Sequence, residues 1–128
     1  AVFEALHVIA PDDVVTLNNL AWSLRRSDSQ RALDLVRQAL AAAPDTPAIQ
    51  DTQAMILLEL GNHDDALGVN QQTLDAQPQS PQYRFHRALI LADAGDEAAA
   101  TTILRELVAG PPFPEQSQAR ELLAELEN

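Results

Sequence analysis

A spacing of 34 residues recurs along this chain and limits its possible folds more than any other feature. Several residue types follow it, and the matching sets are Pro44, Pro78 and Pro112; Ala32, Ala66 and Ala100; Gly61 and Gly95; and Ala54 and Ala88. Unrelated residue types share one period when a chain is built from stacked copies of one supersecondary unit. The first unit is one residue shorter, because Ala21 precedes Ala54 by 33 residues, and Ser27 stands where later units have glycine.

Each unit carries the start signals of helices. Thr46 and Ser80 are suitable N-caps, because a side-chain oxygen can accept a hydrogen bond from a free backbone N–H group of the first turn. Pro47 and Pro81 follow at the first helical position, where a missing N–H group costs nothing. The expected helices, two in each unit and one after the last, cover residues 13–26, 29–43, 47–60, 63–76, 81–94, 97–109 and 114–127.

Glycines and prolines mark where these helices end. Gly61 and Gly95 follow the first helix of their units, where reversal of the chain often needs a positive φ angle. Pro44, Pro78 and Pro112 follow the second helices, and proline disfavours helical geometry in the residue before it. We therefore expect antiparallel helix pairs, with left-handed backbone at both glycines.

The last expected helix, 114–127, has the pattern of a cap on the stack. One stripe of this helix is apolar and contains Ala119, Leu122, Leu123 and Leu126. Other positions are acidic, namely Glu121, Glu125 and Glu127. The terminal element of a repeat stack needs an apolar inner face and a polar outer face. We therefore expect these glutamates to lie on the outer, solvated face.

Charge and composition exclude several classes of function. The net charge is −11, with 19 acidic residues against 8 arginines and no lysine, so the surface repels nucleic acid and anionic lipid. This acidity either keeps the domain soluble or indicates a basic or neutral partner. No apolar stretch reaches the about 18 residues that a membrane span needs, and the absence of cysteine excludes disulfides and thiolate metal sites. A bacterial cytoplasm, periplasm or cell envelope is compatible with this composition.

Signatures of an enzyme are absent from the sequence. His7, His63 and His86 are isolated from other metal-ligating residues, which argues against a metal site. The acidic pairs at 12–13, 64–65 and 96–97 fall at helix starts, where carboxylates cap free N–H groups. Neither a dinucleotide-binding nor a phosphate-binding glycine loop occurs. We therefore expect a non-catalytic protein without cofactor or metal.

The repeating residues resemble those of the tetratricopeptide repeat family. Five positions of each unit carry the likeness: Ala21, Ser27, Ala32, Ala39 and Pro44 in the first; Ala54, Gly61, Ala66, Thr73 and Pro78 in the second; Ala88, Gly95, Ala100, Leu107 and Pro112 in the third. The resemblance implies an all-α fold, a right-handed superhelical stack of antiparallel helix pairs with a C-terminal capping helix. Gln53, Arg87 and Asn70 depart from the family, which usually has large apolar residues at those places.

The same likeness implies how the chain is divided. We expect one domain over residues 1–128. It begins with the remnant of a preceding repeat at 1–11, continues with three repeats at 12–45, 46–79 and 80–113, and ends with the capping helix at 114–128. The remnant is indicated by Ala5 and Leu6, which lie 34 residues before Ala39 and Leu40. The chain is thus expected to be cut from a longer array on its N-terminal side and to end naturally at the cap.

In this family the first helices line a concave groove that binds peptides or proteins. Carried over by position, the predicted groove residues are Asn18, Asn19, Trp22, Arg25 and Arg26; Asp51, Thr52, Met55, Leu58 and Glu59; and Phe85, His86, Leu89 and Asp93. Trp22 and Phe85 are the predicted anchors, because rigid aromatic side chains dominate binding hot spots. Both could instead pack between helices. Arg25 and Arg26 could bind a carboxylate or a polar edge of the partner, or could instead be solvated or paired with Asp28.

Three functions remain open from the sequence. The first is a scaffold that binds a partner protein or peptide in the groove. The second is a structural or self-associating array, suggested by the apolar N-terminal residues Val2, Phe3, Leu6, Val8 and Ile9. The third is the non-catalytic tail of an upstream enzyme. The segments 18–22, 51–52, 85–89 and 113–115, the last followed by Leu122 and Leu123, also look like the C-terminal end of large bacterial repeat proteins, some of them in exopolysaccharide-export and cell-envelope systems.

Overall fold

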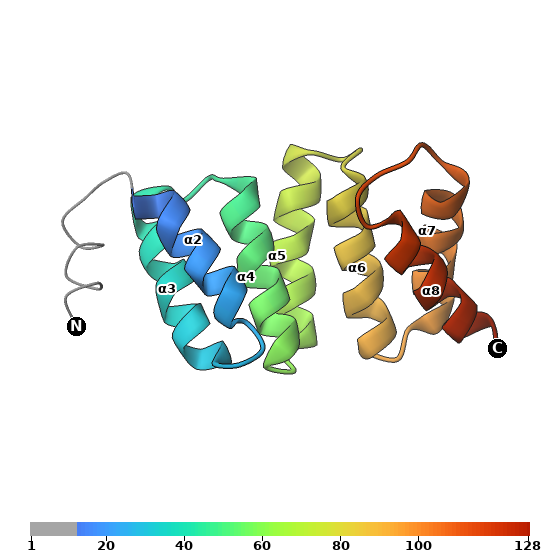
Figure 1. The fold of residues 1–128 in the computed structure, drawn as a ribbon, viewed down its shortest axis with the longest axis horizontal. Coiled ribbons are helices and arrows are strands. Elements are labelled where there is room, and N and C mark those ends of the chain that lie inside the picture. Colours follow the sequence, from blue (N-terminus) through green and yellow to red (C-terminus); the bar gives the residue numbers. More distant parts are fainter. Residues whose placement is uncertain (1–12) are drawn as a thin grey trace.

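The computed structural model describes residues 13–128, which form a row of helices (Figure 1). The helices are α2 (Asp13–Leu24), α3 (Ser29–Ala42), α4 (Pro47–Glu59), α5 (His63–Ala76), α6 (Pro81–Asp93), α7 (Glu97–Ala109) and α8 (Gln116–Glu127). Every boundary lies within two residues of the sequence prediction, and residues 13–128 contain no strand. The predicted remnant at 1–11, with its apolar residues, lies outside the described residues.

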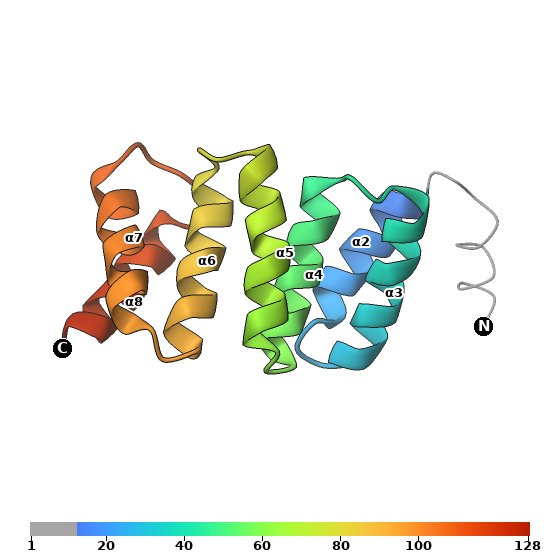
Figure 2. The same ribbon diagram turned by 180° about the vertical axis from the view of Figure 1, so that it is seen from behind.

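Successive helices run in opposite directions and pack against one another in chain order (Figures 1 and 2). Additional contacts join α2 to α4 and α4 to α6, so the first helices of successive units also touch. The two ends of the row lie far apart in both views, with α2 and α3 near one end and α8 at the other. The fold is the predicted all-α solenoid, closed by α8.

The predicted reversal after the first helices is present at both glycines. Gly61 has φ +81° and Gly95 has φ +92°, values that L side chains rarely adopt. The Asn62 N–H group donates to the Leu57 carbonyl at 2.9 Å, and the Gly61 N–H group donates to the Leu58 carbonyl at 3.0 Å. These two bonds form the Schellman arrangement that satisfies the last carbonyls of a helix. The same pair of bonds follows α6.

The predicted N-caps differ from each other. The Ser80 hydroxyl accepts from the Tyr83 N–H group at 3.2 Å, as expected. The Thr46 side chain makes no such bond, so its predicted role as a side-chain cap is wrong. The reason is local, because the Ile49 N–H group donates to the backbone carbonyl of Thr46 at 3.1 Å instead. Asp28 and Asp96 cap α3 and α7 through their carboxylates.

The hydrophobic core has two clusters. One contains apolar residues of α2 to α5 together with Ile90 of α6, and the other contains residues of α6, α7 and α8. The partly buried Leu67 of α5 packs against both. Between them, Asn70 and Thr73 of α5 are fully buried, and the Asn70 side chain donates to the Tyr83 carbonyl at 3.1 Å. The contact between α5 and α6 therefore contains a polar seam, which we define as Asn70, Thr73 and Arg87.

Helix α8 is joined to α7 by both apolar and polar contacts. Ala119 is fully buried in the second cluster, and the leucines of the predicted stripe pack around it. The Gln116 side-chain amide donates to the carbonyls of Leu107 at 3.2 Å and Gly110 at 3.3 Å. These carbonyls lie at the end of α7, where the helix itself has no donors left. Gln116 thus acts as a C-terminal cap for the preceding helix.

Candidate partner-binding groove

A hollow of about 480 Å³ lies where α2, α4, α6 and α8 come together. Its lining residues are Trp22, Arg25, Arg26, Met55, Glu59, Gln82, Phe85, His86, Leu89, Glu115, Gln118, Glu121, Leu122 and Glu125. A smaller hollow of about 180 Å³ shares Trp22 and Gln82 with it and is otherwise lined by Asn18, Asn19, Ala48, Asp51, Thr52 and Tyr83. We call the two together the groove. The repeat places equivalent faces of the first helices beside one another, and α8 closes the far side.

Most of the predicted residues line this groove. Of the fourteen, eight line the larger hollow and four more line the smaller one. The remaining two, Leu58 and Asp93, lie elsewhere. Leu58 packs against the first core cluster, and the Asp93 carboxylate pairs with the His63 ring at 2.7 Å. That the lining residues contact a partner stays a prediction.

Trp22 and Arg25 form one unit at the α2 side of the groove. The guanidinium carbon of Arg25 lies 3.8 Å from the centre of the Trp22 ring, and its Nη1 donates to the Trp22 carbonyl at 2.8 Å. Burial, and then the neighbouring Arg26, lower the pKa of Arg25, while Glu59 opposes the shift. Stacking holds the guanidinium over the indole, and no carboxylate of residues 13–128 forms an ion pair with it.

Neither Arg25 nor Arg26 forms an ion pair with Asp28, whereas their contact with a partner stays a prediction. Arg26 pairs with Glu59 of α4 at 3.3 Å, and not with Asp28. The Asp28 carboxylate instead accepts from the Arg31 N–H group at 3.3 Å, as the cap of α3. Arg25 is therefore the arginine of the groove lining that has no ion pair with a carboxylate of residues 13–128.

Asp51 and His86 form a buried pair beneath the groove surface. The Asp51 carboxylate lies 2.7 Å from Nδ1 of His86, and each residue is 4% exposed. The His86 ring centre lies 6.1 Å from that of Trp22 and 6.0 Å from that of Phe85. Burial, and then the nearby Asp51, raise the pKa of Tyr83. The pair links α4 to α6, so both side chains already have a partner within the fold.

The predicted aromatic anchors differ in exposure. Phe85 is 4% exposed and belongs to the second core cluster, although its edge reaches the groove. Trp22 is half-buried and lines both hollows. Met55, at 6% exposure, and the half-buried Leu89 and Leu122 continue the apolar surface. Trp22 is thus the large aromatic side chain with surface left for a partner.

The side of the groove formed by α8 was missed by the sequence prediction. Glu121 and Glu125 are exposed, as expected for a solvated face, but they also line the groove. Glu115, Gln118 and Leu122 join them from the same helix and the turn before it. The i, i+4 spacing of Glu121 and Glu125 could have shown that they share a face, but it could not show which neighbour that face meets.

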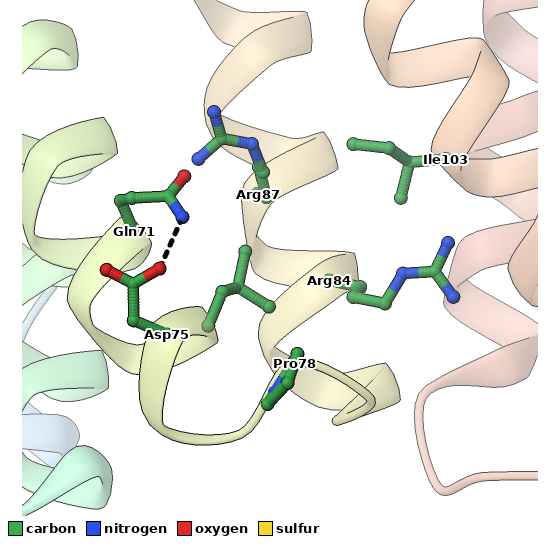
Figure 3. A pocket seen from close by; sticks show the side chains of 7 residues that line it. Gln71, Asp75, Pro78, Arg84, Arg87 and Ile103 are labelled. Carbon is green, nitrogen blue, oxygen red and sulfur yellow. Dashed lines mark hydrogen bonds between the residues drawn. The ribbon is translucent and has the colours of Figure 1, made fainter.

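Outside the groove, another hollow of about 420 Å³ opens between α5, α6 and α7 (Figure 3). Gln71 and Asp75 approach it from α5, Arg84 and Arg87 from α6, and Ile103 from α7 (Figure 3). Its polar groups are bonded within the fold, since Gln71 donates to Asp75, Arg84 to Glu106 and Arg87 to Asn70.

Neither a metal centre nor a membrane segment emerges from the part of the chain that is described. Residues 13–128 contain no group of three or more histidine and carboxylate side chains arranged to hold a metal ion. Within the same range, each helix is too short or too polar to cross a lipid bilayer.

Three solved structures show the same fold. The type III secretion translocator chaperone SycD of Yersinia enterocolitica matches with a TM-score of 0.76 and 21% identity, over 94% of this chain and 95% of the chaperone. SycD in complex with a peptide of the translocator YopD matches with a TM-score of 0.72 and 22% identity, over 93% and 95%. The Sgt2 TPR domain of Aspergillus fumigatus matches with a TM-score of 0.72 and 18% identity, over 88% and 78%.

The sequence comparisons address the family directly. No curated protein matches the chain. The model of the tetratricopeptide repeat matches residues 19–81 and residues 52–117, and the two matches together cover well over half of the sequence. Gly61 and Gly95, and the buried Ala32, Ala66 and Ala100, lie within the matched residues and repeat at a spacing of 34. The chain belongs to the tetratricopeptide repeat family.

Proposed function

We propose that this chain is a non-catalytic scaffold that holds a peptide segment of a partner protein in the groove. One observation carries the proposal: Trp22, stacked under Arg25, presents aromatic surface in a hollow shared by four helices. Large aromatic side chains beside a cation are typical of the few residues that dominate binding energy at protein interfaces.

The groove offers complementary contacts for such a segment. Trp22, Met55, Leu89 and Leu122 supply an apolar floor that side chains of the partner can cover. Arg25 supplies guanidinium donors for a carboxylate or a backbone carbonyl of the partner. Since Asp51 and His86 bond to each other, we assign them to holding α4 against α6 and not to direct contact.

One further observation supports the proposal. A protein of the same fold, SycD, was solved with a peptide of the translocator YopD. Fold likeness alone does not transfer a function, so this is an analogy. That the scaffold works inside a larger bacterial protein, of the exopolysaccharide-export or cell-envelope type, stays a prediction of the sequence resemblance. The self-association and enzyme-tail alternatives also stay predictions.

A selection from a library of random displayed peptides tests the proposal. Peptides enriched on the wild-type chain are synthesised, and their dissociation constants are measured by fluorescence anisotropy for Trp22→Ala, Arg25→Ala and Arg37→Ala. Arg37 is an exposed arginine of α3 outside the groove, which makes it the matched control for Arg25. Circular dichroism and thermal melting verify that each variant is folded.

We expect Trp22→Ala to weaken binding about 30-fold or more, the size of a hot-spot loss of about 2 kcal/mol. Arg25→Ala should weaken it about fivefold to tenfold, because the guanidinium donors for a carboxylate or a backbone carbonyl of the peptide are lost. Arg37→Ala should leave the affinity unchanged. Selected peptides that bind folded Trp22→Ala as tightly as the wild type would overturn the proposal, and so would a library from which nothing is enriched.

A further inference from the structure

We infer that the groove selects a partner segment that carries lysine or arginine side chains, held against the carboxylates of α8 and the turn before it. This inference rests on the proposed function and names the chemical class of the segment. It is carried by the charge of the groove lining together with the apolar surface between those charges.

The groove lining is dominated by unpaired negative charge. Six charged side chains line the larger hollow apart from the His86 ring: Arg25, Arg26, Glu59, Glu115, Glu121 and Glu125. Arg26 and Glu59 pair with each other at 3.3 Å and so offset one another. One arginine then faces three glutamates, a local balance of +1 − 3 = −2. A cationic segment is the complement of that lining.

The three glutamates lack a cation within the fold. Neighbouring carboxylates are paired, as Glu106 is with Arg84 and Glu127 is with Arg105, but no residue of 13–128 forms an ion pair with Glu115, Glu121 or Glu125. Oε2 of Glu115 is buried without a hydrogen-bond partner. A buried acceptor that lacks a donor costs free energy, and a bound donor would recover it. Like charges at i, i+4, such as Glu121 and Glu125, also repel each other.

The apolar surface beside these carboxylates favours a polypeptide segment over a free cation. Leu122 lies between Glu121 and Glu125 in the sequence and lines the same hollow, and Leu89 faces it from α6. Lysine and arginine have long apolar stems that cover such surface while their charged ends reach the carboxylates. A metal ion would leave Leu89, Leu122 and Trp22 uncovered.

The test is the composition of peptides selected from the random library by three forms of the chain. These are the wild type, Glu121→Gln/Glu125→Gln and the control Asp34→Asn/Asp45→Asn. Asp34 and Asp45 are exposed and lie outside the groove, so the control removes the same two charges from the surface. Dissociation constants of the selected peptides are then measured on all three forms at low and high salt.

We expect peptides from the wild type to be rich in lysine or arginine beside aromatic or aliphatic residues. Glu121→Gln/Glu125→Gln should weaken these peptides about fivefold, from two surface charge contacts, and reduce the salt dependence. Asp34→Asn/Asp45→Asn should change neither. Selected peptides without basic enrichment, or with equal affinity for both double variants, would overturn the inference while leaving the proposed function standing. Absence of any enriched peptide would overturn both.

Discussion

Arg87 of α6 donates a hydrogen bond from Nη1 to Oδ1 of Asn70 in α5 over 3.2 Å, and both side chains stand where the repeat family usually has large apolar residues. The two departures therefore meet in space, 17 residues apart in sequence. The side-chain amide nitrogen of Asn70 donates to the Tyr83 carbonyl at 3.1 Å. A polar pair that satisfies itself can replace an apolar contact, whereas either member alone would leave a buried group unpaired.

A double-mutant cycle on this pair should be strongly non-additive. Asn70→Leu and Arg87→Leu should each lower the free energy of unfolding by about 1–3 kcal/mol, because each leaves a partner without its hydrogen bond. The double variant should lose less than the sum of the two, by about 1 kcal/mol or more. Urea unfolding followed by circular dichroism measures all four proteins. Additive losses would show that the bond contributes nothing.

The same substitution should have opposite effects at two glycines. Gly61→Ala should destabilise by about 1 kcal/mol, because Gly61 holds φ +81° and alanine is strained there. Gly68→Ala should stabilise by about 0.5–1 kcal/mol, because Gly68 lies inside α5 and a Cβ there would meet nothing within 4 Å. Thermal melting of the two variants provides the comparison. Equal shifts of the melting temperature would contradict this account.

Removal of the Gln116 amide should loosen the end of α7. Gln116→Ala takes away the donor shared by the Leu107 and Gly110 carbonyls, and we expect a loss of about 1–2 kcal/mol. Hydrogen exchange should become faster in the last turn of α7 and in α8. Gln118→Ala, an exposed change on the same helix, is the control and should leave exchange in α7 as it is in the wild type.

Alkaline pH should destabilise the fold through Tyr83. Burial, and then Asp51, raise its pKa above the ordinary value of 10.0, so the folded state holds the phenol proton more tightly than the unfolded state does. This contribution to stability is fully present below pH 10 and is lost as the pH rises through the higher folded pKa. Because the chain has one tyrosine, phenolate absorbance reports on Tyr83 alone.

A titration midpoint at the ordinary value in the folded protein would contradict this prediction. Tyr83→Phe serves as the control, since it keeps the ring and removes the titrating group. Its free energy of unfolding should fall less steeply than that of the wild type as the pH rises above 10.

The sequence predicted the helices well because their ends depend on short-range chemistry. Gly61 and Gly95 occupy positions that need positive φ. Ser80 caps the start of α6 with its side chain, and Pro81 takes the first helical position, where its missing N–H group costs nothing. Thr46 shows the limit of that reasoning. Its side-chain hydroxyl and its backbone carbonyl can both accept from the Ile49 N–H group, and the sequence does not show that the carbonyl is the one used.

The groove was predictable only in part, for a geometric reason. The first-helix residues follow the repeat, so their positions carry over from one unit to the next. Helix α8 follows no repeat, and its apolar stripe fixes which side packs inward but not which remaining side borders the groove. Glu121 and Glu125 are exposed as expected, but the sequence could not show that they also border the groove. The burial of Phe85 and His86 likewise depends on contacts that arise only in the folded stack.

The division of the core into two clusters has a consequence for any partner. The groove is lined by α2 and α4 from one cluster and by α6 and α8 from the other, so a bound segment touches both. Such a segment therefore connects the two clusters on either side of the polar seam between α5 and α6. Because the segment binds the folded chain and not the unfolded one, its binding free energy adds to the stability of both clusters together. The bound chain should melt at a higher temperature than the free chain, and the size of that increase becomes a measure of occupancy.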